Sequence, residues 1–61
     1  MITYYEIELK EASSKEWEII KECDNIDSAR KSIKEFKRED KKEGVSNIMY
    51  RIIANIRTEV F

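Results

Sequence analysis

The 61-residue sequence contains no histidine, no proline, one glycine and one cysteine. Without histidine the chain lacks the one side chain whose ordinary pKa lies near neutral pH, and so it lacks an ordinary general base. Cys23 has neither a second cysteine for an internal disulfide nor a histidine for a metal site. No glycine-rich loop that would bind phosphate is present either. These absences predict a protein that is not an enzyme and that uses no cofactor and no metal.

Long apolar runs are also missing. No stretch approaches the roughly 18 consecutive apolar residues of a membrane span, and the N-terminal MITYYEIELK lacks the basic start and apolar run of a signal peptide. An unpaired cysteine suits a reducing compartment, so we expect a cytoplasmic protein. No linker, low-complexity run or internal repeat divides the chain, which predicts a single small domain over residues 1–61.

Charged and apolar residues dominate what is present, at 41% each. The net charge of −1 conceals an uneven distribution, because residues 1–24 carry three basic and seven acidic side chains whereas residues 25–61 carry nine basic and six acidic ones. The abundance of isoleucine and aromatic residues indicates a folded chain. Any binding function is therefore expected to depend on which half of this charge distribution meets a partner.

The longest periodic stretch is DSARKSIKEFKREDKKEG, from Asp27 to Gly44. Ala29, Ile33 and Phe36 are spaced by four and three residues, so they share one face of a helix whose other positions are mostly charged. Asp27 is suited to accept hydrogen bonds from the first turn, and Gly44 to take the left-handed conformation that ends a helix. We predict one amphipathic helix between these two residues.

Three other stretches have the character of strands. Residues 3–10 alternate apolar and polar side chains, residues 17–23 follow a short polar loop, and residues 49–60 form the longest strand. Val45 and Ile48 are expected to be apolar plugs in the loop between the helix and the last strand. The order of elements is strand, strand, helix, strand.

The facing of the second strand is ambiguous, because Ile19 and Ile20 point to opposite sides. Placing Trp17, Ile19 and Cys23 toward the helix puts only Lys21 on the buried side, whereas the other choice buries two glutamates beside Ile20. We adopt the first arrangement. Lys21 is then an inward-pointing charge, which protects an edge strand from pairing with another chain.

The chain is predicted to fold as an α+β, ββαβ domain. The first two strands form a hairpin and a right-handed helical crossover follows, which gives a three-stranded antiparallel sheet of order 2-1-3 with the helix across one face. Pairing Leu9 with Trp17 in the hairpin would set Glu8 opposite Glu18, a like-charge pair. Ala54, small among bulky neighbours on the last strand, is expected to let the helix approach closely.

The sheet face away from the helix is the predicted protein-binding surface. Tyrosine, isoleucine and methionine side chains, including Met49, would supply apolar contacts, and glutamates would select a basic partner, including a basic groove that normally holds nucleic acid. The predicted partner-binding residues are Tyr4, Glu6, Glu8, Glu18, Ile20, Glu22, Arg51, Ile53 and Arg57. The alternative is a solvated face whose ion pairs each contribute under about 1 kcal/mol.

Two further functions remain open. The helix could contact a phosphate backbone through its basic residues, although acidic residues interleave with them at spacings that favour intrahelical pairs, and no aromatic residues stand among them for stacking on bases. The candidate nucleic-acid residues are Arg30, Lys34, Lys37, Arg38 and Lys41. The chain could instead form a structural homodimer, either by stacking its open faces or by pairing edge strands.

Four segments carry a resemblance: a first strand ending in ELKE, a second beginning WEIIKE, the helix start DSARKSI and the last strand MYRIIANI. In this pattern the chain resembles short uncharacterised ββαβ proteins encoded by phages and prophages of low-GC bacteria. It departs from them at Cys23, where an aromatic residue is usual. The resemblance implies an accessory or inhibitor protein that binds an unidentified protein partner in the cytoplasm of a bacterial host, with no catalytic residues.

Overall fold

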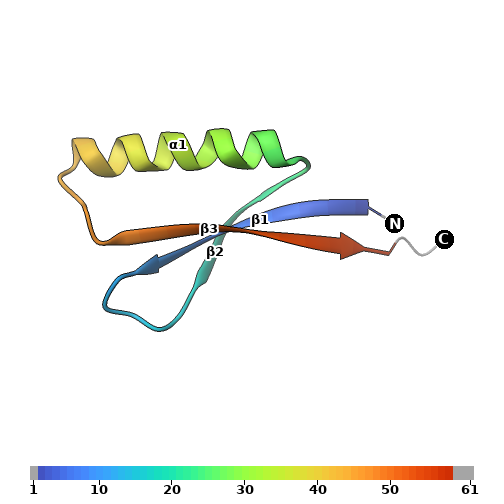
Figure 1. Cartoon of the computed structure of the whole chain (residues 1–61), viewed down its shortest axis with the longest axis horizontal. Helices are drawn as coiled ribbons and strands as arrows, with labels where there is room; N and C mark the ends of the chain where they lie inside the picture. Colours follow the sequence, from blue (N-terminus) through green and yellow to red (C-terminus); the bar gives the residue numbers. More distant parts are fainter. Residues whose placement is uncertain (1, 59–61) are drawn as a thin grey trace.

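The computed structural model describes residues 2–58, which form one sheet and one helix (Figure 1). The elements are β1 (Ile2–Glu11), β2 (Glu18–Cys23), α1 (Ile26–Lys42) and β3 (Ile48–Arg57). The sheet has the order β2-β1-β3, and β1 is antiparallel to both neighbours. The predicted α+β fold, its strand order and its single helix are therefore confirmed.

The strand boundaries differ from the prediction in all three strands, and β1 (Ile2–Glu11) extends one residue beyond the predicted range 3–10 at each end. β2 begins at Glu18, so that Trp17 precedes it. β3 begins at Ile48, which pairs with Glu11 as the first residue of the strand rather than plugging the preceding loop. Within the described residues β3 ends at Arg57; the remainder of the predicted strand, up to Val60, lies partly outside them.

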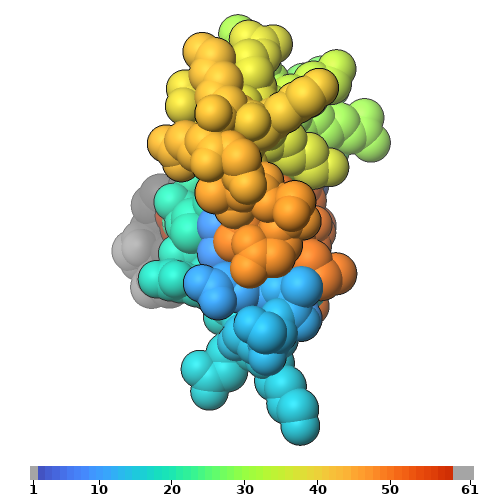
Figure 2. Space-filling view, turned by 90° about the vertical axis from the view of Figure 1, so that its left-hand side faces the viewer, coloured from blue at the N-terminus to red at the C-terminus, as the bar shows by residue number. Residues whose placement is uncertain are grey.

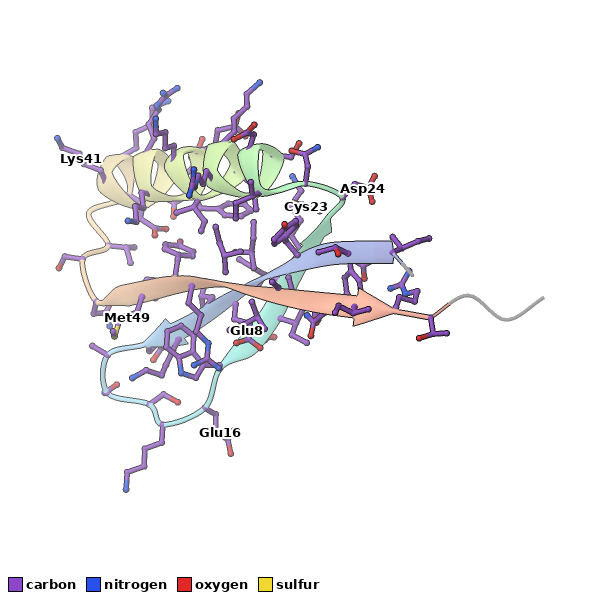
Figure 3. The ribbon with its side chains drawn as sticks, turned by 45° about the vertical axis from the view of Figure 1, so that its right-hand side comes forward. Glu8, Glu16, Cys23, Asp24, Lys41 and Met49 are labelled. Atoms are coloured by element: carbon purple, nitrogen blue, oxygen red, sulfur yellow. The ribbon has the colours of Figure 1, made fainter. Side chains whose placement is uncertain are left out.

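The core lies between the sheet and α1. Ile7 on the central strand is fully buried, and Ala29 on the helix and Cys23 at the end of β2 close over it. Figure 3 shows Cys23 in the space between the helix and the sheet, as the sequence predicted. Partly buried apolar side chains surround this centre; they are Tyr5, Ile33, Phe36, Tyr50 and Ile52.

The turn between β1 and β2 projects away from the helix. Figure 2 views the molecule end-on, with α1 above the sheet and this turn below it. Lys10 Nζ donates a hydrogen bond to the Ser14 carbonyl oxygen at 2.9 Å, and Ala12 N–H donates to the Asn47 carbonyl oxygen at 2.7 Å. The first bond closes the turn on the end of β1, and the second ties the turn to the residue that precedes β3.

The helix begins two residues earlier than predicted. Asn25 is the capping residue: its backbone is extended, its side-chain oxygen accepts from Ser28 N–H at 2.8 Å, and its carbonyl accepts from Ala29 N–H at 3.2 Å. Asp27 lies inside the first turn, where its negative charge still favours the positive end of the helix dipole. Both residue types are good caps, and the two added residues include Ile26, which is partly buried.

The end of the helix agrees with the prediction. Gly44 has φ of 73°, and its N–H donates to the Lys41 carbonyl oxygen at 3.3 Å, while Val45 N–H donates to the Asp40 carbonyl oxygen at 2.8 Å. This pair of bonds satisfies two of the last free carbonyls of the helix. A left-handed backbone strains any residue with a side chain, so the only glycine in the sequence is where the chain needs it.

Tyr50 links β3 to the last turns of the helix. Its ring stacks on Phe36 with centroids 5.9 Å apart, and its hydroxyl donates to the Asp40 carboxylate. Burial raises the pKa of Tyr50 to about 12, and the hydrogen bond to Asp40 and the charge of that carboxylate act in the same direction. This contact extends the core toward the start of β3.

The other end of β3 is less covered than predicted. Ala54 is exposed, and Ile56 on the same side of the strand keeps 67% of its surface accessible. The helix does not approach closely at Ala54, because its backbone lies against β1 and β2. The helix-side face of β3 is therefore only half covered, at Tyr50 and Ile52, which pack against the core.

The capping assignment predicts a difference between two neighbouring substitutions. Asn25→Ala removes the side-chain acceptor of the first turn, and we expect it to lower the free energy of unfolding by about 1 kcal/mol. Asp27→Ala loses only a favourable charge near the helix start, worth roughly 0.3–0.5 kcal/mol. Urea unfolding followed by circular dichroism measures both, and a larger loss for Asp27→Ala would contradict the assignment.

The Tyr50 contact predicts a loss of stability at alkaline pH. The pKa of Tyr50 is about 12 in the folded state and 10.0 in the unfolded state. The stability that the protonated hydroxyl adds to the fold is therefore fully present below pH 10 and is lost as the pH rises toward 12. Asp40→Asn should lower the pKa of Tyr50 toward 10 without reaching it, since burial remains. Ultraviolet titration of phenolate formation checks this, and an unchanged Tyr50 transition in the variant would refute it.

Candidate functional site

The sheet face opposite α1, called here the open face, gathers charged, aromatic and apolar side chains from all three strands. Glu8 points to this side in Figure 3, whereas Cys23 points to the helix. Strand pairing defines its members, which are Ile2, Tyr4, Glu6, Glu8, Lys10, Trp17, Ile19, Glu22, Met49, Arg51, Ile53, Asn55 and Arg57.

An irregularity in the hairpin decides which β2 residues reach the open face. Ile7 pairs with Lys21 but Glu8 pairs with Ile19, so Ile20 is an extra residue between two regular stretches. Such a bulge inverts the alternation on one side of it. Ile19, which was predicted to face the helix, therefore lies opposite Glu8 on the open face. That part of the prediction is wrong.

The same bulge corrects the hairpin register and the position of Trp17. Leu9 pairs with Glu18 rather than with Trp17, and Glu8 does not face Glu18. Trp17 was predicted to face the helix but contacts Arg51 on the open face. A uniform alternation through residues 17–23 would put the two adjacent isoleucines on opposite faces; with the bulge both remain exposed, Ile19 at 57% and Ile20 at 37%.

Beyond the bulge, at Lys21 and Cys23, the predicted orientation of β2 toward the helix is confirmed. Lys21 points toward the helix, and its Nζ donates to the Ser32 hydroxyl at 2.9 Å. Ser32 is only 6% exposed, so this bond satisfies a buried polar group of α1. Lys21 thus gives the β2 edge an inward-pointing charge that is anchored to the helix.

Arg51 organises one half of the open face. Its Nε forms an ion pair with Glu8 Oε1 at 2.5 Å, and its guanidinium carbon lies 4.0 Å from the ring centre of Trp17. Lys10 Nζ lies 5.7 Å from the same indole ring. An aromatic face attracts a cation placed over it, so two positive charges lie close to Trp17 at the turn end of the sheet.

Arg57 forms a second group of the same kind at the opposite end. Its Nη2 contacts Glu22 Oε1 at 3.0 Å, and its guanidinium carbon lies 4.4 Å from the ring centre of Tyr4. The hydrogen bond to Glu22 and the charge of that carboxylate raise the pKa of Arg57. Between the two groups Asn55 donates a hydrogen bond to the Glu6 carboxylate.

Both arginines therefore extend from β3 across the central strand. Arg51 connects β3 to β1 and to the residue preceding β2, and Arg57 connects all three strands. Glu6 is paired directly with Glu22, a like-charge pair, and Asn55 and Arg57 each bind one of the two carboxylates. The open face carries three acidic and three basic residues, so it is charge-balanced and not acidic as predicted.

The structure gathers seven of the nine predicted partner-binding residues on the open face. Glu18 pairs with Leu9 in the helix-side row, and Ile20 is the bulge residue. Two members that sequence reasoning placed wrongly, Trp17 and Ile19, belong to the face instead. The adjacent isoleucines were the one signal of a bulge in the sequence. The seven correctly predicted residues are Tyr4, Glu6, Glu8, Glu22, Arg51, Ile53 and Arg57.

The helix presents a second charged surface. With 100° between successive residues, its seven basic side chains lie within an arc of about 140° that points away from the core, over about 18 Å of length. All seven are exposed, and Lys41 projects away from the sheet in Figure 3. We call these residues the basic stripe: Arg30, Lys31, Lys34, Lys37, Arg38, Lys41 and Lys42.

Acidic residues interrupt the basic stripe in the sequence but not on the helix surface. Glu35 and Glu39 lie at its border, and Asp40 turns toward the sheet to bind Tyr50. Within residues 2–58 the two ion pairs both belong to the open face. The predicted intrahelical pairs are therefore not formed, and all five candidate nucleic-acid residues share the stripe.

Comparisons of the chain with protein-family models, with curated proteins and with solved structures found no match. In the described part of the chain, α1 is neither long enough nor apolar enough to cross a membrane. Over the same residues, no three side chains of the metal-binding types come close enough together to hold an ion. The site is therefore interpreted from its own geometry.

The contact between Arg51 and Trp17 predicts a spectroscopic change. Trp17 is the only tryptophan, so its fluorescence reports on this part of the face alone. Arg51→Ala uncovers the indole ring, and we expect a shift of its emission to longer wavelength and stronger quenching by iodide or acrylamide. Arg57→Ala, the same substitution at the distant group, should leave the emission unchanged. Equal shifts in both variants would contradict the local contact.

Proposed function

We propose that the protein is a non-enzymatic binding module that recognises a protein partner through its open face. The observation that carries this proposal is the pair of arginine–aromatic groups, Arg51 on Trp17 and Arg57 on Tyr4, on a sheet face that no element of the described chain covers. Tryptophan, tyrosine and arginine are the residues that most often dominate binding energy at protein interfaces.

The geometry of these groups favours tight binding. Glu8 and Glu22 hold the two arginines in place, so little side-chain entropy is lost when a partner covers them. Stacked guanidinium groups keep free N–H donors at their edges, which suit carbonyl or carboxylate acceptors on a partner. The face is therefore already arranged for contact before a partner arrives.

Apolar side chains at the border complete an interface of ordinary composition. Ile19, Met49 and Ile2 keep 57%, 47% and 44% of their surfaces accessible around the two arginine groups. A shallow hollow beside Trp17, formed with Leu9 and the turn after β1, offers a place for one protruding side chain of the partner. When a partner buries such side chains, the free energy of binding becomes more favourable by roughly 25 cal/mol for each Å² of apolar surface removed from water.

The biological setting in this proposal comes from the resemblance to small phage and prophage proteins. In that setting the module is an accessory or inhibitor protein that binds a protein in the cytoplasm of a bacterial host. The balanced charge of the open face favours a partner with a mixed polar and apolar surface over the strongly basic groove expected from the sequence.

The basic stripe supports a second candidate function, contact with a nucleic-acid backbone. Seven cations along about 18 Å of one exposed helix face provide a charge density suited to phosphates. The stripe has no aromatic residue for stacking on bases, so such binding would be independent of sequence. Steep dependence on salt concentration would be its signature.

The test captures partners from lysate of a low-GC bacterium that has been treated with nuclease, using the tagged full chain, and then measures affinity for the identified protein by calorimetry. Trp17→Ala should weaken that binding by about 30-fold or more, since a central aromatic anchor contributes about 2 kcal/mol. Lys34→Glu combined with Lys41→Glu, on the opposite side of the molecule, is the matched control and should leave the affinity unchanged.

The reverse pattern would overturn the proposal. If the double charge reversal on α1 abolishes binding while Trp17→Ala has no effect, the functional surface is the basic stripe. Recovery of nucleic acid from untreated lysate, falling steeply with salt and sensitive only to the helix variant, would support the second candidate.

A further inference from the structure

The two edges of the sheet differ in how they resist pairing with another chain. β2 is six residues long, contains a bulge and carries the inward-pointing Lys21, all of which are devices that prevent edge-to-edge association. β3 is ten residues long and pairs with β1 without interruption. The helix-side positions of β3 hold no charge, and the strand contains neither proline nor lysine.

The β3 edge also borders apolar surface that residues 2–58 leave uncovered. Ala54 and Ile56 lie on the helix side of β3, where α1 does not reach them, and Ile56 is the most exposed large apolar residue of the described chain. Tyr50 and Ile52 on the same side are only partly buried. An additional strand beside β3 would supply neighbours for all four residues.

We propose that β3 pairs with β3 of a second copy, in antiparallel orientation around a two-fold axis at Ile53, to form a continuous six-stranded sheet. A two-fold axis perpendicular to the sheet requires each strand to run antiparallel to its own copy. Each side chain must also stay on its own face, so residues that oppose one another are separated by an even number of positions. Ile53 opposite Ile53 satisfies both conditions.

This register is supported by the pairs it creates. On the helix side it sets Ile52 beside Ala54 and Tyr50 beside Ile56 of the second copy, so each large residue meets a small or exposed one. On the open face it sets Arg51 beside Asn55 and Met49 beside Arg57, with no like charges opposed. Moving the axis by one residue to Ala54 would set Arg51 opposite Arg57, which is unfavourable.

The partner is a second copy and not a different protein, because the uncovered residues of β3 pair with one another across the two-fold axis, Ile52 with Ala54 and Tyr50 with Ile56. The pairing leaves both helices on one side of the six-stranded sheet and both open faces on the other, so it is compatible with the proposed protein-binding surface. It goes beyond that function, since the open face could bind a partner with or without it.

The first test is disulfide cross-linking in a Cys23→Ala background. Ile53→Cys should give a covalent dimer on mild oxidation, because opposed residues in an antiparallel pair have Cβ atoms about 4.5–5.5 Å apart. Met49→Cys is the matched control on the same face. In the proposed register its two copies lie about 27 Å apart, so no dimer should form. Cross-linking of Met49→Cys, or of neither variant, would refute the register.

The second test keeps Cys23 and measures association by sedimentation equilibrium over a wide range of protein concentration. The native chain should be dimeric, and Ala54→Lys, which places an inward-pointing charge on β3, should weaken the dimer at least tenfold. Ala12→Lys makes the same change at an exposed alanine in the turn after β1 and should have no effect. Circular dichroism confirms that both variants are folded.

A native chain that stays monomeric at all concentrations would overturn the proposal, as would a dimer that Ala54→Lys does not weaken. Neither result would affect the proposed function of the open face, which is tested by Trp17→Ala and an identified partner. Failure of the dimer and failure of the binding module are therefore distinguishable.

Discussion

The structure depends on the burial of Ile7, the only large side chain that loses all contact with solvent among the described residues. It lies on the central strand, under Ala29 of the helix and beside Cys23 of β2, so one residue holds three elements together. A chain of this size has few other buried groups to share that task. Its neighbours on β1, Glu6 and Glu8, point to the opposite face, where Glu8 pairs with Arg51.

The sequence was sufficient for the architecture because its patterns were strong and local. Alternation in the first and last strands, a helical period at Ala29, Ile33 and Phe36, and one glycine at Gly44 each have a single good structural interpretation. The strand order followed from the hairpin and the crossover. The start of the helix was placed two residues late because Asn25 and Asp27 are both good caps, and only the burial of Ile26 distinguishes them.

The site was predicted less well, because it depends on features that are not local. A bulge at Ile20 changes which side of the sheet Trp17 and Ile19 occupy, and periodicity alone does not locate an extra residue. The open face was expected to be acidic because the glutamates of the first two strands were visible as a group. Arg51 and Arg57 were predicted on the same face, but Glu18 was counted there too, and the bulge moves it to the helix-side row opposite Leu9.

The outward-facing basic stripe of α1 gives the molecule an electric dipole between its two layers. The helix carries seven basic and four acidic residues, and its basic side chains point away from the sheet, whereas the strands and the turn between β1 and β2 carry five basic and six acidic residues (Figure 1). A particle of almost no net charge migrates slowly in a field but still rotates in it. Near a highly charged surface the protein is therefore expected to rotate before contact. The sign of the surface charge then decides whether the helix or the sheet contacts it first.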